Sequence, residues 1–146
     1  MKKICILLTI AGLLFSACSR GPEAIQYGKD ACWHCKMTIM DKRFAAEIVT
    51  AKGKVYKFDS AECMAGYLKE NPGLATDKQA LLFVSYYQAP GSFNDARKSA
   101  FLEAPTVSSP MGGNLAAFGS ENLAKRFQNG AAGTIYNWNE LLKSRP

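Results

Sequence analysis

Residues 43–62 read RFAAEIVTAKGKVYKFDSAE, and this stretch decides the predicted fold. Residues 43–50 become apolar and β-branched towards their end, which predicts a strand. Residues 51–54 form a polar turn with one glycine, and residues 55–58 again alternate between apolar and polar side chains. The segments on either side of the turn therefore predict a β-hairpin.

A helix is expected directly after the hairpin. Asp59 and Glu62 have the spacing of a capping box, in which side chains satisfy two backbone amides at a helix start. Residues 71–73, Asn-Pro-Gly, are expected to end the helix. Further along, residues 81–87 predict a strand and residues 93–100 a short helix. The apolar positions at helical spacing are Cys63, Met64, Tyr67 and Leu68.

The second half of the chain repeats this pattern. Residues 58–60, Phe-Asp-Ser, precede the first predicted helix, and residues 118–120, Phe-Gly-Ser, precede a second one. Residues 134–138 predict a closing strand. We therefore expect two small related strand-strand-helix-strand units, about 31–90 and 91–146, packed as one α+β domain. Apolar positions that match between the halves are Cys63 with Leu123 and Tyr67 with Phe127.

Composition restricts the classes of function. The chain has 146 residues, of which 48% are hydrophobic and 21% charged. This balance excludes intrinsic disorder, and the length excludes a large multidomain enzyme. The net charge is +6, but the basic residues form no run and two of them stand at the extreme N-terminus. A nucleic-acid partner is therefore not expected.

Residues 1–17 predict a lipoprotein signal peptide. Two lysines precede the apolar stretch 4–14, which is too short for a membrane span of about 20 residues. Residues 14–18, Leu-Phe-Ser-Ala-Cys, resemble a bacterial lipobox, in which cleavage precedes an acylated cysteine. We expect an exported protein, lipid-anchored through Cys18 to a bacterial membrane on its periplasmic or cell-surface side. Plain secretion after the same cleavage is the alternative.

Residues 18–30 predict a tether between this anchor and the folded domain. They contain Gly21, Pro22 and Gly28 among mixed polar residues, a composition typical of linkers. The domain is expected to span residues 31–146. A partner on or near the same membrane would be within reach.

Three cysteines remain for chemistry. Cys5 is removed with the leader and Cys18 would be acylated, which leaves Cys32, Cys35 and Cys63. An odd number cannot all pair within one chain. In an exported protein, a Cys-X-X-Cys pair with one further cysteine fits a redox pair, a metal site, or a disulfide with a buried spare thiol.

Soft sulfur ligands concentrate in residues 32–37, Cys-Trp-His-Cys-Lys-Met. Thiolates and thioethers select soft ions, above all Cu(I). The two cysteines and Met37 suit a low-coordinate Cu(I) site that leaves room for ligand exchange. Met111 stands between a proline and a glycine in residues 108–113, and the composition of this segment is typical of a loop. It is the candidate for a thioether from the other half of the chain.

Each of these features also has a simpler explanation. The Cys-X-X-Cys pair could form a structural disulfide in an anchored lipoprotein. His34 could be an exposed loop residue, and Met37 and Met40 could fill gaps in the core. Cys63 could be a small buried hydrophobe on the apolar stripe of its helix. The three cysteines and His34 could nominally supply the four ligands that zinc requires.

A thiol–disulfide oxidoreductase that uses Cys32 and Cys35 is the second hypothesis. Thioredoxin-like proteins place such a pair at a helix start, where the thiol pKa is lowered. Here the pair follows the predicted tether, a strand rather than a helix follows it, and no βαβ pattern surrounds it. Copper binding is therefore favoured, with an activity that would depend on the methionines.

The order of these motifs resembles the NosL family of copper-binding lipoproteins, which assist the assembly of nitrous-oxide reductase. The resemblance runs from about Cys32 to the C-terminus. The motifs that carry it are Cys32-X-X-Cys35-X-Met37, Arg43-Phe44-Ala45-Ala46, Phe58-Asp59-Ser60 with Cys63, Asp95-Ala96, Ser109-Pro110-Met111-Gly112, Ala117-Phe118, and Trp138 with Leu141.

The resemblance implies two related α+β units and a chaperone, not an enzyme, that holds Cu(I) outside the cytoplasm. Nitrous-oxide reductase would be the copper acceptor, and a copper donor protein is a further expected partner. This chain has Lys36 where the family often has glycine, and no histidine after Pro-Met-Gly. The expected copper ligands are therefore Cys32, Cys35, Met37 and Met111. A resemblance of the first half to small heavy-metal modules favours Cys35 with Cys63 instead.

Overall fold

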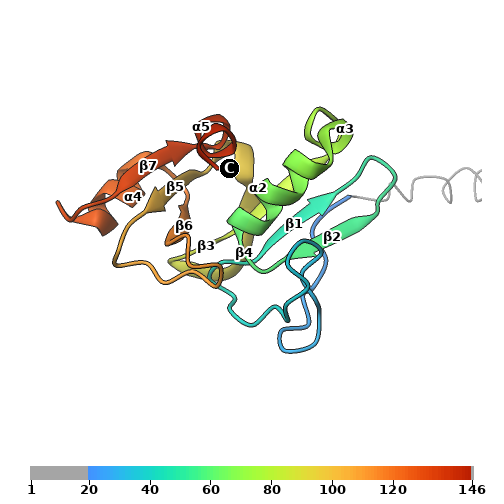
Figure 1. Cartoon of the computed structure of the whole chain (residues 1–146), viewed down its shortest axis with the longest axis horizontal. Helices are drawn as coiled ribbons and strands as arrows, with labels where there is room; N and C mark the ends of the chain where they lie inside the picture. Colours follow the sequence, from blue (N-terminus) through green and yellow to red (C-terminus); the bar gives the residue numbers. More distant parts are fainter. Residues whose placement is uncertain (1–19, 146) are drawn as a thin grey trace, which may run out of the picture.

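The computed structural model describes residues 20–145 and shows two antiparallel sheets with helices packed beside them (Figure 1). The predicted signal peptide and Cys18 lie outside these residues. The first sheet has the strand order β2-β1-β3-β4 and the second β6-β5-β7. The strands are β1 Ala46–Val49, β2 Val55–Phe58, β3 Leu81–Tyr86, β4 Ala89–Asp95, β5 Ala100–Glu103, β6 Leu115–Phe118 and β7 Thr134–Asn137.

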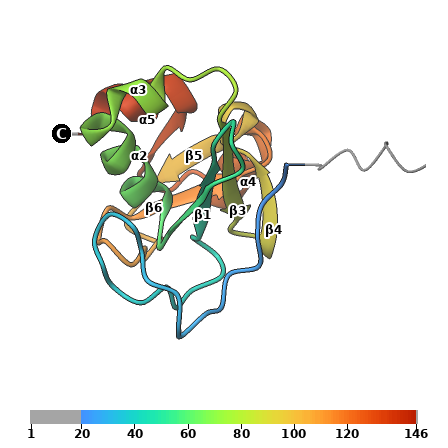
Figure 2. The same cartoon turned by 90° about the vertical axis from the view of Figure 1, so that its right-hand side faces the viewer.

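The two sheets and their helices form one domain. The Tyr87 N–H donates to the Ala117 carbonyl oxygen at 2.9 Å, which joins the sheets at β6. One core cluster contains Ile48 from the first sheet together with Phe101 and Leu141 from the second half. Figure 2 shows α2, α3 and α5 on the same side of the strands. The helices are α2 Ala61–Glu70, α3 Pro72–Ala75, the 3₁₀ helix η1 Ala96–Lys98, α4 Glu121–Gln128 and α5 Trp138–Ser144.

The two halves have the same topology, and the α+β prediction is confirmed. In each half a central strand, β1 or β5, pairs antiparallel with the strand before the helix and the strand after it. Ser60 begins α2 and accepts from the Cys63 N–H at 3.2 Å, and Ser120 begins α4 and accepts from the Leu123 N–H at 3.3 Å. The repeated serine is thus a helix cap in both units.

Several local predictions are wrong. Ser60, not Asp59, caps α2. Residues 93–100 form the end of β4, the 3₁₀ helix and the start of β5 rather than one helix. Trp138 begins α5 instead of ending a strand, because Asn137 and Glu140 form a capping box. β4 also crosses residue 90, so the strand lies on both sides of the boundary expected between the half-units.

Residues 23–30, predicted as part of a tether, lie on the domain instead. The Ile25 side chain is only 8% exposed and belongs to the core. The Glu23 N–H donates to Glu47 at 2.8 Å, and Lys57 Nζ donates to Asp30 at 2.9 Å. The buried Ile25 side chain and the two polar contacts therefore hold this segment on the domain, although its composition is typical of a linker. Within the described residues, no helix is both long and apolar enough to cross a membrane.

Candidate metal site

A tight turn before the first sheet positions Cys32 and Cys35. The Cys32 N–H donates to the Met37 carbonyl oxygen at 2.8 Å, and the Lys36 N–H donates to the Cys32 carbonyl oxygen at 3.0 Å. Lys36 has a φ of 66°, in the left-handed region where glycine is favoured. Lysine at this position therefore keeps the turn, at some conformational cost.

The first turn of α2 positions Cys63. The Ser60 cap fixes the start of the helix, so that Cys63 is directed from the helix towards the turn rather than towards solvent. Its side chain is buried, as is that of Cys32, whereas Cys35 is partly exposed. The hydrophobic stripe predicted for this helix is thus confirmed, with one thiol included in it.

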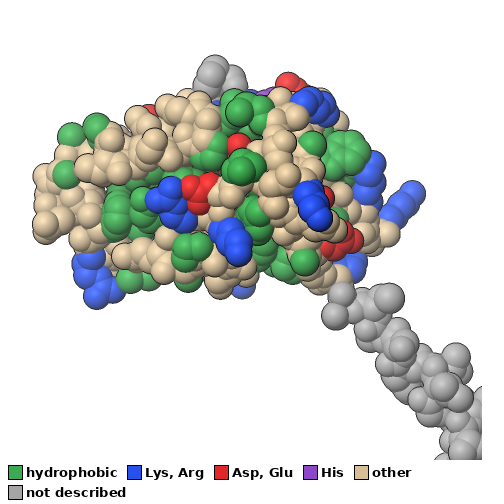
Figure 3. Space-filling model, turned by 90° about the horizontal axis from the view of Figure 1, so that it is seen from below, with side chains coloured by type: hydrophobic (Ala, Val, Ile, Leu, Met, Phe, Trp, Pro, Cys, Tyr) green, Lys and Arg blue, Asp and Glu red, His purple; other side chains and the backbone are tan. Residues whose placement is uncertain are grey.

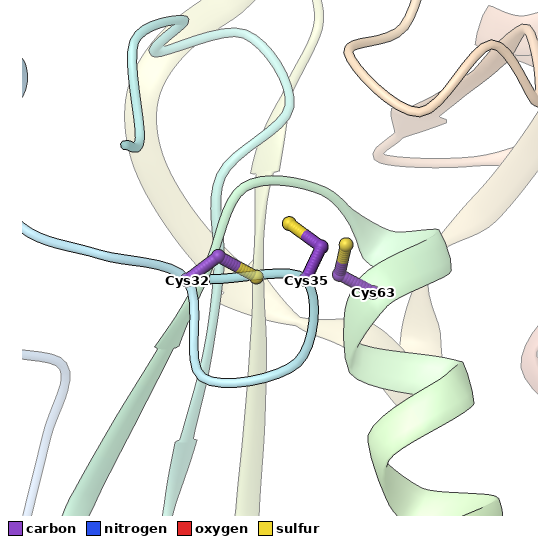
Figure 4. Close-up of side chains that lie close together, drawn as sticks. All are labelled: Cys32, Cys35 and Cys63. Atoms are coloured by element: carbon purple, nitrogen blue, oxygen red, sulfur yellow. The ribbon is translucent and has the colours of Figure 1, made fainter. Parts of the chain in front are cut away.

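The three sulfur atoms form one group. The Sγ atoms of Cys32, Cys35 and Cys63 all lie within 4.8 Å of one another, and all three cysteines are free thiols. Figure 4 shows the side chains directed into a common space between the turn and the helix. The structure therefore combines the Cys-X-X-Cys pair with Cys63. Three soft donors around one point can hold a single soft ion.

Hydrogen bonds directed at its sulfur lower the pKa of Cys32 to about 5. The largest contribution comes from the Cys63 thiol. The backbone N–H groups of Asp59, Cys35 and His34 also point at this sulfur, and together they outweigh the opposing effect of burial. Cys32 is therefore a thiolate at neutral pH, the form in which cysteine binds metals.

The other two thiols keep their protons. Burial raises the pKa of Cys35. The pKa of Cys63 is raised because its thiol donates to the Cys32 thiolate and is itself buried. The group consequently carries one negative charge at neutral pH, which attracts a cation. Binding an ion through a second sulfur requires that thiol to lose its proton.

His34 packs against α2 and does not belong to the sulfur group. Its Nδ1 lies 3.4 Å from a Glu70 carboxylate oxygen. A Cβ added at Gly66 would lie only 2.7 Å from His34 Nε2, so the imidazole rests directly on the helix backbone. His34 thus holds the turn with Cys32 and Cys35 against the helix that carries Cys63. The sequence alone gave no signal for the Gly66 contact.

The two predicted methionine ligands are exposed side chains on loops. Met37 is 54% exposed and Met111 is 42% exposed. The loop before Met111 is fixed to the start of α2, because Ser109 Oγ donates to Glu62 Oε1 at 2.6 Å. Since Glu62 precedes Cys63 directly, this bond fixes the methionine loop of the second half to the helix turn that carries Cys63. The sequence pattern predicted only a helix-capping role for Glu62.

Comparison with known proteins identifies one family. The family model described as NosL matches residues 24–145. Among solved structures, the crystal structure of the copper chaperone NosL from Shewanella denitrificans is similar, with a TM-score of 0.67 and 22% sequence identity over 83% of this chain and 95% of that chain. A search of curated proteins found no match. The structural likeness supports the fold described above.

Proposed function

This chain belongs to the NosL family, and from that premise we propose that it is a copper chaperone. It binds Cu(I) as cargo through cysteine sulfur and passes the ion to an acceptor, without catalysing a reaction. The observation that supports this proposal best is the group of three free thiols within 4.8 Å of one another. Thiolate ligands select Cu(I) over harder ions, and three of them leave the coordination open for exchange.

Copper capture would begin at Cys32, the thiol that is already ionised at neutral pH. The Cys63 thiol donates a hydrogen bond to that sulfur. When Cu(I) takes the place of this proton between the two sulfurs, Cys63 can ionise and the proton leaves to solvent. Binding is therefore expected to release protons. Cys35, the most accessible of the three, is the sulfur that an incoming ligand reaches first.

Met37 and Met111 would act as transient ligands during transfer. Met37 is exposed on the turn that carries Cys32 and Cys35, and Met111 is exposed on the loop that Ser109 bonds to Glu62, the residue before Cys63. Thioethers are soft but neutral, so they hold Cu(I) less firmly than thiolates. The proposed acceptor is nitrous-oxide reductase. Anchoring through a lipid on Cys18 would keep the chaperone at the membrane outside the cytoplasm.

The test is a Cu(I) titration of the reduced full-length protein in competition with a chromophoric Cu(I) chelator. We expect one tightly bound Cu(I) per chain. The variant Cys32→Ser/Cys35→Ser should lose this binding, and Met37→Leu/Met111→Leu should keep most of the affinity but slow the transfer of copper to apo nitrous-oxide reductase. Equal affinity in the wild type and the serine variant would reject the copper proposal.

Thiol–disulfide exchange is the second candidate function. Hydrogen bonds from the Cys63 thiol and from backbone N–H groups favour it, since they lower the pKa of Cys32 to about 5 and thiolates are the attacking species in exchange. The two candidates differ in one measurable respect. An oxidoreductase keeps its activity in Met37→Leu/Met111→Leu, whereas copper transfer is expected to slow.

The contact between His34 and Gly66 gives a further prediction. Alanine in a helix interior normally stabilises by about 1 kcal/mol relative to glycine. Here a Cβ would meet the imidazole at 2.7 Å and displace the turn that carries two thiols. We expect Gly66→Ala to weaken Cu(I) binding about tenfold, as for other groups that support metal ligands. Chelator competition measures the affinity.

The control introduces Gly66→Ala into a variant whose His34 imidazole has been removed. His34→Ala/Gly66→Ala should bind Cu(I) as well as His34→Ala alone, because the atom that the new methyl group meets is gone. If the double variant binds as weakly as Gly66→Ala, the steric explanation is wrong.

A further inference from the structure

Exposed apolar side chains gather around the thiol site. Among the described residues, the large hydrophobic side chains that are exposed are Trp33, Met37, Met40 and Met111. The first three lie on the segment that carries Cys32 and Cys35, and the fourth lies on the loop bonded to α2 beside Cys63. Figure 3 views the molecule from the side of these loops and shows hydrophobic and basic side chains next to one another.

Trp33 is held in place at this surface by its neighbours. Its ring packs edge-on against Tyr56, with ring centroids 5.0 Å apart. The Lys36 and Lys54 ammonium groups lie 5.6 and 4.9 Å from the ring centroid of Trp33. Despite these contacts the indole is 41% exposed. A rigid, partly exposed tryptophan is a typical anchor of protein interfaces.

Within the part of the chain that the structure describes, the two lysines beside Trp33 have no acidic partner. In residues 20–145, ion pairs engage Arg43, Lys57, Lys125 and Arg145, but neither Lys36 nor Lys54. Lys36 Nζ donates to the Trp33 carbonyl oxygen at 2.6 Å, which leaves its charge uncompensated. The rim of the thiol site therefore presents two free positive charges around an aromatic anchor.

We propose that Trp33, Lys36 and Lys54 form the docking surface for the copper acceptor, and that the acceptor presents carboxylates around its own copper-binding site. This inference rests on the proposed chaperone function and names the chemistry of its partner. The acidic groups would pair with Lys36 and Lys54, while an apolar side chain of the acceptor covers Trp33. Oppositely charged faces speed association and fix the orientation of the complex.

This orientation serves the transfer of the ion. Lys36 directly follows Cys35, the most accessible thiol, and Met37 follows Lys36 in the same turn. A partner that pairs with Lys36 is therefore held next to the sulfur from which Cu(I) leaves. An anionic lipid surface would match the charges but offers no soft ligand for the ion, so an acidic protein fits this surface better.

The test measures copper transfer from the Cu(I)-loaded protein to apo nitrous-oxide reductase at low and high salt. We expect Lys36→Glu/Lys54→Glu to slow the transfer about tenfold at low salt and to remove most of its salt dependence. Trp33→Ala should slow the transfer at both salt concentrations. The matched control Lys78→Glu/Lys98→Glu makes the same charge change at two exposed lysines elsewhere and should transfer at the wild-type rate.

Two measurements separate the possible failures. Cu(I) affinity is determined for every variant, and Lys54→Glu alone is included because Lys36 neighbours a thiol. If the wild type binds Cu(I) but does not transfer it to the reductase, the acceptor assignment fails. If the wild type transfers copper and Lys36→Glu/Lys54→Glu transfers it at the same rate as the wild type and the control Lys78→Glu/Lys98→Glu, the docking surface is rejected. Loss of binding to phosphatidylglycerol vesicles with unchanged transfer would assign the lysines to lipid and also overturn the proposal.

Discussion

Replacing Cys63 with serine is expected to lower the Cu(I) affinity by more than about a hundredfold, beyond the ten- to hundredfold typical of a residue that only supports a ligand. The Cys63 sulfur lies within 4.8 Å of the other two and holds the proton that Cu(I) would replace. A serine hydroxyl is a hard and poorly acidic donor that cannot take over this role. Chelator competition on the reduced protein gives the affinity.

The control variants separate ligation from packing. Cys63 is 1% exposed in the core, so Cys63→Ser also buries a hydroxyl and should lower the free energy of unfolding by about 1–3 kcal/mol. Cys63→Ala buries no new polar group but should lose copper affinity to the same extent. If Cys63→Ala binds Cu(I) like the wild type, Cys63 is a packing residue and the ligands are Cys32, Cys35 and a methionine.

The sequence predicted the secondary structure best where local signals and the repeat agreed. β1, β2, α2 and β3 follow from alternation, helical spacing and a helix-stop motif. The match between Ser60 and Ser120 predicted the second unit from the amino-acid sequence. In both units the serine Oγ accepts a hydrogen bond from the backbone N–H of the residue three positions later. This shared capping role explains why the serine recurs.

Predictions failed where tertiary contacts overrode local composition. Residues 93–95, predicted as the start of a short helix, form the end of β4 because the partner strand β3 supplies their hydrogen bonds. Residues 23–30 have a linker composition but are fixed by Ile25 and by the buried Glu47 carboxylate. Neither outcome is encoded in a short window of sequence.

The thiol site was only partly predictable for a similar reason. The Cys-X-X-Cys spacing identifies two of the three sulfurs, since both stand on one turn. The role of Cys63 depends on how α2 packs against that turn, and its sequence context fits a core residue equally well. The Ser109–Glu62 and His34–Gly66 contacts join segments distant in sequence. Such contacts become visible only when the segments are placed in space.

Replacing Glu47 with glutamine is expected to stabilise the protein at alkaline pH. The Glu47 side chain is completely buried in β1, and its Oε1 has no hydrogen-bond partner among the described residues. Burial raises the pKa of this carboxyl to about 7, with Glu23 and Asp30 adding repulsion and Lys57 and a backbone N–H opposing it. The ionised Glu47 carboxylate therefore destabilises the folded protein.

The sign of the pH dependence follows from this shift. An unfolded chain releases the glutamate proton near pH 4.3, whereas the folded protein keeps it until about pH 7. Between these values the folded state binds more protons, so the free energy of unfolding falls as the pH rises. Glutamine stays neutral and avoids this loss. At pH 8 we expect Glu47→Gln to be more stable by about 2–3 kcal/mol.

Urea unfolding of the reduced protein at pH 5 and pH 8 measures the effect. The advantage of Glu47→Gln should be small at pH 5, where the wild-type side chain is mostly protonated, and should grow towards pH 8. Glu121→Gln changes an exposed glutamate of α4 and should leave the pH dependence unchanged. If wild type and Glu47→Gln lose stability in parallel over this range, Glu47 is already ionised at pH 5. The contact of the Glu23 N–H with Glu47 would then be charge-assisted, and the N-terminal segment would be held more firmly at neutral pH than the raised pKa implies.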